Sequence, residues 1–155
     1  MNTKFNIAGA AEGAEQWEKA ERNYLQSIEL AIRVMPDTNQ NVEMFRTAYA
    51  LFLNKRHRFG EAEPLFKLAL SRADRNPQFR DDDVFKAAQF GLAIAQYAAA
   101  PTKEHLREFE VVSTPPADAN SEIKQITQEQ MDVMKFLGLP LPAMEQPASS
   151  LPKAQ

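Results

Sequence analysis

Apolar residues recur at spacings of three and four along the first two thirds of the chain, and this period predicts a series of amphipathic helices. In the first run, Trp17, Tyr24 and Ile28 fall on one helical face. Helix-compatible runs cover residues 12–34, 41–55, 61–73, 84–99 and about 102–111. Pro64 fits the first turn of its run, because its missing N–H would have no intrahelical partner there. The pattern therefore predicts an all-α protein.

The last third of the chain has a different composition, because seven of the ten prolines lie after residue 100. Within it, the capping box from Thr127 to Gln130 and the stop signal at Gly138 predict a short helix over about 128–137. An isolated helix of this length is marginal in water, so we expect it to dock on the rest of the protein.

These patterns divide the chain into five predicted parts. They are a flexible N-terminus (1–11), a helical domain (12–112), a linker (113–121), a C-terminal helix (122–138) and a disordered Pro-rich tail (139–155).

One stretch of the first run is repeated 42 residues later, with large apolar, small and charged positions recurring in kind. The first copy is Trp17, Ala20, Glu21, Tyr24, Ser27, Ile28, Ala31 and Arg33, and the second is Phe59, Ala62, Glu63, Phe66, Ala69, Leu70, Ala73 and Arg75. A period in this range is typical of a solenoid of helical hairpins, in which one hairpin cannot bury its apolar face alone.

The hairpin over 44–73 resembles the tetratricopeptide repeat (TPR). The matching residues are Tyr49, Ala50, Leu53, Phe59, Ala62, Glu63, Phe66, Ala69 and Leu70. The 42-residue offset and the string FGEAEPLFKLAL resemble the longer repeat of kinesin light chains. The resemblance implies a short right-handed superhelix of antiparallel hairpins, about two and a half repeats long, with the C-terminal helix as a cap. The first repeat lacks a convincing first helix around Ile7 and Ala8.

In that family, the first helices of the hairpins form a concave face that binds segments of other proteins. By resemblance, the partner-binding residues here are Met44, Thr47, Ala48, Leu51, Asn54, Lys55, Phe90, Ile94 and Tyr97. Met44, Ala48 and Leu51 make this face mostly apolar, unlike the polar clamp that some members use for a C-terminal carboxylate. Leu51 and Met44 either contact a partner or pack beneath the C-terminal helix. In the second case the contacting residues are Met131, Met134, Phe136 and Leu137.

Composition narrows the function further. A formal charge of −3 gives no field that would recruit nucleic acid or an anionic membrane, and the absence of cysteine excludes disulfides and thiolate metal sites. No apolar run is long enough to span a bilayer, so we expect a cytoplasmic protein. The two histidines, His57 and His105, lie in or near predicted connections, and no motif for a metal, a cofactor or catalysis is present.

The basic run from Lys55 to Arg58 either contacts an acidic partner or, as we favour, is a solvated turn between helices. Arg72 is expected to face water on an outer helix.

The leading hypothesis is a non-catalytic adaptor or scaffold that binds a peptide or helix of another protein on the apolar concave face. One alternative is a small TPR chaperone for secreted or unfolded clients. Another is a structural subunit whose binding face is filled by its own C-terminal helix or by another copy of the chain. We expect no enzymatic activity.

Overall fold

The computed structural model describes residues 2–36, 39–79, 82–113 and 121–141, and all of its regular structure is helical. The helices are α1 (Asn2–Gly13), α2 (Trp17–Val34), α3 (Gln40–Lys55), α4 (Phe59–Arg75), α5 (Asp83–Ala99), α6 (Lys103–Ser113) and α7 (Ser121–Leu137), with a 3-10 turn, η1, at Pro77–Phe79. The prediction of an all-α protein is therefore confirmed.

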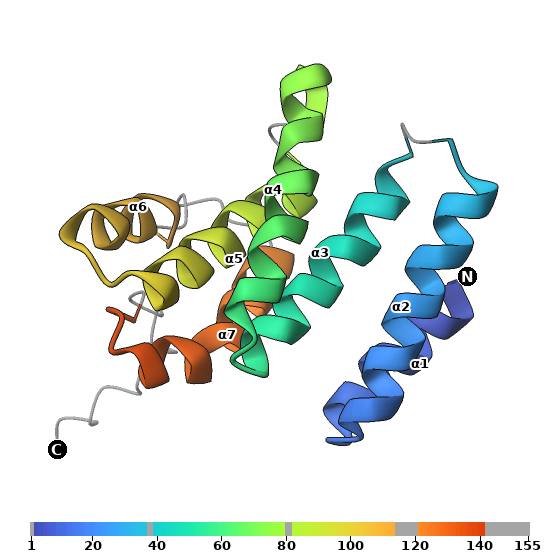
Figure 1. Cartoon of the computed structure of the whole chain (residues 1–155), viewed down its shortest axis with the longest axis horizontal. Coiled ribbons are helices and arrows are strands. Elements are labelled where there is room, and N and C mark those ends of the chain that lie inside the picture. The colour runs from blue at the N-terminus through green and yellow to red at the C-terminus, as the bar shows by residue number, and fades with distance from the viewer. Residues whose placement is uncertain (1, 37–38, 80–81, 114–120, 142–155) are drawn as a thin grey trace, which may run out of the picture.

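Each helix from α1 to α6 packs against the next one in the sequence (Figure 1), so these six helices can be described as three consecutive pairs, α1–α2, α3–α4 and α5–α6. The pairs are also in contact with one another, because α2 packs on α3, α4 on α5, and α3 on α5. The α1–α2 pair lies at one end of the molecule and α6 at the other. The last helix, α7, breaks the sequential order, because its main neighbours are α3 and α5.

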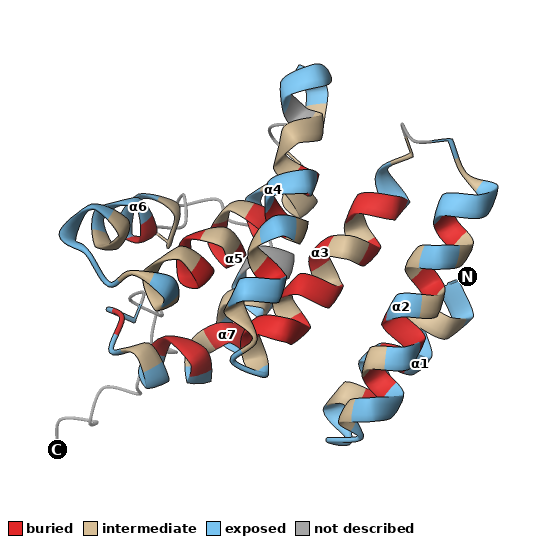
Figure 2. Ribbon diagram, viewed as in Figure 1, coloured by how far each residue is buried: buried red, intermediate tan, exposed pale blue. Residues whose placement is uncertain are grey.

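Buried residues line the sides that these helices turn toward each other (Figure 2). The largest cluster joins α1 to α5 around Phe52, Phe66 and Tyr24, and a second cluster joins α5, α6 and α7 around Ile94, Phe109 and Met134. Ala50, Ala62 and Ala69, predicted to lie where helices approach closely, are all buried, at 0, 0 and 7% exposure.

The two similar sequence stretches each begin a helix. Trp17 begins α2 and Phe59 begins α4. Ala20 and Ala62 are both fully buried, as is the aromatic side chain four residues later in each copy (5% exposed for Tyr24 and 0% for Phe66). The two stretches therefore present the same face to the core.

The prediction of a flexible segment over 1–11 was wrong, because residues 2–13 form α1. Phe5 fixes this helix to the core, with its ring centroid 5.8 Å from that of Tyr24 and 4.6 Å from that of Phe45. The run over 12–34 is also not one helix. It breaks between Gly13 and Trp17, where Glu15 has a φ of 57°. The sequence pattern did not predict α1, because this helix is rich in Gly and Ala and is therefore only weakly amphipathic. Its small residues let it pack closely against its neighbours.

The C-terminal helix begins at Ser121, close to the predicted segment 122–138, but the capping box predicted to start it near residue 128 is wrong, because Thr127 and Gln130 lie inside α7. Its predicted end at Gly138 is confirmed. Gly138 has a φ of +68°, and the N–H of Leu139 donates to the carbonyl of Met134 at 2.9 Å. This is a Schellman-type end, which uses the freedom of glycine at positive φ.

Leu139, assigned to the disordered tail, is buried. Residues 114–120 of the predicted linker and 142–155 of the tail lie outside the described residues.

Candidate functional site

The predicted partner-binding residues come from two helices. Met44, Thr47, Ala48, Leu51, Asn54 and Lys55 lie on α3, and Phe90, Ile94 and Tyr97 on α5. None of them is exposed: Thr47, Asn54, Phe90 and Ile94 are buried, and the others are half-buried. The contacts of these residues therefore determine whether this surface is open or already covered.

Much of this surface is covered by α7. Phe90 and Ile94 share an apolar cluster with Val133, Met134 and Leu139, and Tyr97 packs against the same cluster. We call the surface formed by Leu51, Lys55, Phe90, Ile94 and Tyr97 the α3–α5 face. It carries an amphipathic helix from the same chain.

The other predicted residues on α3 pack elsewhere. Met44 contacts the cluster of Ala31, Val42 and Phe45, and Ala48 packs against the main core. Asn54 donates from Nδ2 to the carbonyl of Gly91 at 3.0 Å, which ties α3 to α5. Leu51, predicted to contact a partner or to pack beneath the C-terminal helix, packs its side chain against the main core, while its backbone carbonyl accepts a hydrogen bond from α7.

Of the residues predicted to contact this face from the C-terminal helix, Met134 is fully buried, and Met131 and Leu137 pack beside it. Phe136 is 64% exposed and stacks instead on His57, with ring centroids 3.9 Å apart. Val133 and Gln130 were not among the residues predicted to contact this face, although both lie within the predicted stretch 128–137. A helix from Ser121 places both with Ile126 at spacings of four and seven, on one face.

Two polar contacts add to this apolar seam. The amide Nε2 of Gln130 donates to the Leu51 carbonyl at 3.3 Å, and Glu129 lies 3.8 Å from the ammonium of Lys55. Lys55 also pairs with Glu12 on α1, whose other carboxylate oxygen accepts a hydrogen bond from Tyr24 at 2.6 Å. Burial, together with the negative charge of Glu12 and this hydrogen bond, raises the pKa of Tyr24 well above its usual value.

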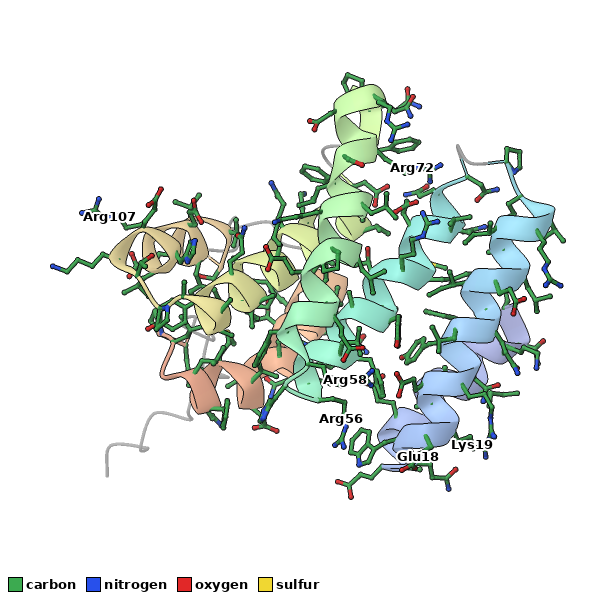
Figure 3. The ribbon with its side chains drawn as sticks, in the orientation of Figure 1. Glu18, Lys19, Arg56, Arg58, Arg72 and Arg107 are labelled. Carbon is green, nitrogen blue, oxygen red and sulfur yellow. The ribbon has the colours of Figure 1, made fainter. Side chains whose placement is uncertain are left out.

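The basic turn, Lys55–Arg58, is engaged within the chain instead of being only solvated as predicted. Arg56 lies 4.7 Å from the centre of the Trp17 ring, and Arg58 pairs with Glu21 and Glu61 at 2.7 Å each. Figure 3 shows Arg56 and Arg58 directed from this turn toward the start of α2. The hydrogen bonds from Arg58 hold the pKa of Glu61 below its usual value. Through these contacts the turn joins the first two helix pairs. Through Lys55 and His57 it also contacts α7.

A second charged group lies at the opposite end of α3. Glu43 accepts hydrogen bonds from Arg46 at 2.7 Å and from Arg72 at 3.0 Å, and the Arg72 side chain is only 12% exposed. The prediction that Arg72 faces water was therefore wrong (Figure 3). Burial of this carboxylate requires the two arginines, because an unpaired buried charge is costly. The group borders a small cavity also lined by Gln40, Phe79, Asp82 and Phe85.

Four buried side-chain oxygens in the described residues have no hydrogen-bond partner: Glu43 Oε2, Thr47 Oγ1, Asn54 Oδ1 and Gln130 Oε1. Unpaired buried acceptors are uncommon in native proteins, and each one lowers stability. Gln130 belongs to α7 and lies where α7 meets α3, so the contact between these two helices contains an unpaired buried oxygen.

Within the described residues, no three His, Asp or Glu side chains are close enough together to hold a metal ion, and no helix has the length and apolarity needed to cross a bilayer. Comparisons of the chain with protein-family models, with characterised proteins and with solved structures found no match.

Proposed function

We propose that this chain is a TPR-like protein-interaction module that binds an amphipathic helix on its α3–α5 face. The observation that carries the proposal is the seating of α7, an amphipathic helix, across α3 and α5. Apolar side chains of that helix bury Phe90 and Ile94 beneath them. The seam has the composition of a helix-in-groove complex, with apolar anchors on one helical face and polar contacts at its edges.

The arrangement of the other helices supports the TPR-like part of the proposal. Helix pairs follow one another along the chain, and matching sequence stretches begin α2 and α4. The first helices of the second and third pairs, α3 and α5, pack side by side. In a right-handed superhelix of such pairs, these helices form the concave side. The last helix would then lie across that side instead of capping the end of the array.

The test uses full-length protein carrying Met134→Asp. A charge at this fully buried position should release α7, because an unpaired buried carboxylate is strongly unfavourable. A fluorescein-labelled peptide of residues 121–141 should then bind saturably by fluorescence anisotropy. The wild-type chain, whose face is occupied, should bind it at least about tenfold more weakly because the tethered α7 competes at high effective concentration. Gln128→Asp, at an exposed position of the same helix, is the matched control and should behave as wild type.

The same variant separates this function from a structural role for α7, the alternative that the filled face favours. An interaction module keeps cooperative thermal unfolding by circular dichroism after α7 is released. A structural subunit loses it, because the helix pairs then depend on α7 for their core. Failure of the peptide to bind a folded Met134→Asp chain contradicts the proposed function.

A further inference from the structure

We infer that the partner helix differs from α7 at one position: it carries an apolar residue where α7 has Gln130, next to a carboxylate in the place of Glu129. This inference rests on the proposed function and specifies the partner's chemistry. It makes α7 a weak resident ligand that a better-matched helix replaces.

Gln130 is the residue of α7 that fits its surroundings least well. Its side chain is completely buried, yet its one hydrogen bond within the described residues is long, 3.3 Å from Nε2 to the Leu51 carbonyl, and its Oε1 has no partner. Leu51 lies inside α3, where its carbonyl is also aligned with the N–H of Lys55 four residues later. The Oε1 atom of the amide has therefore lost its hydrogen bonds to water without gaining one in the protein, which weakens the docking of α7.

The neighbours of Gln130 on the same helical face are apolar. Ile126 precedes it by one turn, and Val133 and Met134 follow it by one turn. Across the seam, Leu51 offers Gln130 its backbone carbonyl, while its half-buried side chain packs against the main core. An apolar residue at this position would continue the apolar row of α7 without an unpaired amide.

The carboxylate requirement comes from Lys55. Its ammonium lies between Glu12 on α1 and Glu129 on α7, at 2.5 and 3.8 Å. The Lys55 side chain is only 24% exposed, so a partner with a basic residue at this position would place two cations together in a partly desolvated site. A carboxylate one residue before the apolar anchor therefore sets the register of the bound helix.

Tethering explains why weak docking suffices for α7 and not for a partner. A helix joined to its site by a short linker acts at millimolar effective concentration, so it stays docked with modest intrinsic affinity. A partner on another molecule has no such tether, so it needs a higher intrinsic affinity to displace α7. Replacement of a half-satisfied buried amide by an apolar side chain supplies about tenfold or more in affinity.

The experiment compares four labelled peptides of residues 121–141 on the full-length Met134→Asp chain: the native sequence, Gln130→Leu, Gln128→Leu and Glu129→Lys. We expect Gln130→Leu to bind about tenfold tighter than the native peptide. Gln128→Leu makes the same chemical change at an exposed position, so it should bind like the native peptide. Glu129→Lys should bind a few-fold more weakly, with the difference shrinking at high salt.

A second measurement uses the otherwise native chain. Gln130→Leu should slow amide hydrogen exchange in α7, whereas Gln128→Leu should leave it unchanged. Equal binding of the native and Gln130→Leu peptides, or faster exchange of α7 in the Gln130→Leu chain, overturns the inference while leaving helix binding intact. If no peptide binds to a Met134→Asp chain that keeps its helical spectrum, the proposed function itself fails. If that chain does not fold, the exchange measurement decides alone.

Discussion

At the scale of single residues, the closest approach of α4 and α5 depends on Gly91. A Cβ atom at this position would lie 2.2 Å from Cζ of Phe66, a fully buried ring. Because Gly91 has no side chain, α5 can also offer its Gly91 carbonyl to Asn54 on α3. One small residue thus allows three helices to meet.

Gly91→Ala should destabilise the protein by about 1–3 kcal/mol, because the new methyl group overpacks a filled site. Gly9→Ala is the matched control. It lies in the interior of α1, and nothing is within 4 Å of the added atom, so it should be neutral or stabilising by up to about 1 kcal/mol. Urea denaturation measures both. Equal behaviour of the two variants would show that α4 and α5 are not in close contact.

At the scale of elements, the packing of α1 and of α7 is the hardest to predict from the sequence. α1 lacks an apolar stripe, and its place in the fold depends on Phe5 and on buried Ala8 and Ala11. α7 has a clear apolar face, but the partner of that face is distant in sequence. Helices of this length need tertiary contacts to persist.

Phe5→Ala should cost about 2 kcal/mol of unfolding free energy, since this half-buried ring contacts Tyr24 and Phe45. Asn6→Ala, at the exposed neighbouring position, should change stability by less than about 0.5 kcal/mol. Thermal denaturation of the two variants tests this directly. An unchanged midpoint for Phe5→Ala would restore the prediction of a flexible N-terminus.

At the scale of the whole molecule, hydrogen bonds between polar side chains join neighbouring helices. Tyr24 and Tyr49 reach across helices to Glu12 and Glu21. Burial is the first cause that raises the pKa of each tyrosine, followed for Tyr49 by its hydrogen bond to Glu21. The folded protein therefore favours neutral phenols.

This raised pKa predicts the sign of alkaline unfolding. An acid with a higher pKa in the folded state contributes its full stability below the unfolded tyrosine value of about 10, and loses it as the pH rises above that value. Stability should therefore fall above about pH 10, with Tyr24 contributing up to about 1.4 kcal/mol per pH unit. Denaturant titrations from pH 8 to 11.5 should show a shallower decline for Tyr24→Phe than for wild type. Parallel declines would contradict the assignment.

The sequence predicted the five helices over residues 17–111 to within a few residues, because their apolar periods are strong and prolines or polar turns separate them. It also placed the glycine stop of α7 at Gly138, a local feature of backbone conformation. It erred where local signals were weak or ambiguous. An Ala- and Gly-rich helix resembled a flexible terminus, and an interior Thr127–Gln130 stretch matched a capping box.

By itself, the sequence determined that this protein is helical, that two stretches fill matching helices, and that α3 and α5 carry apolar side chains. These properties depend on residues a few positions apart, which helical periodicity brings onto one face. Only the tertiary structure decided that α7 lies across α3 and α5, that the residues of the basic turn contact other parts of the chain, and that Gln130 is buried at the seam. Those outcomes depend on contacts such as Gln130 with Leu51, 79 residues apart, for which no local pattern is selective.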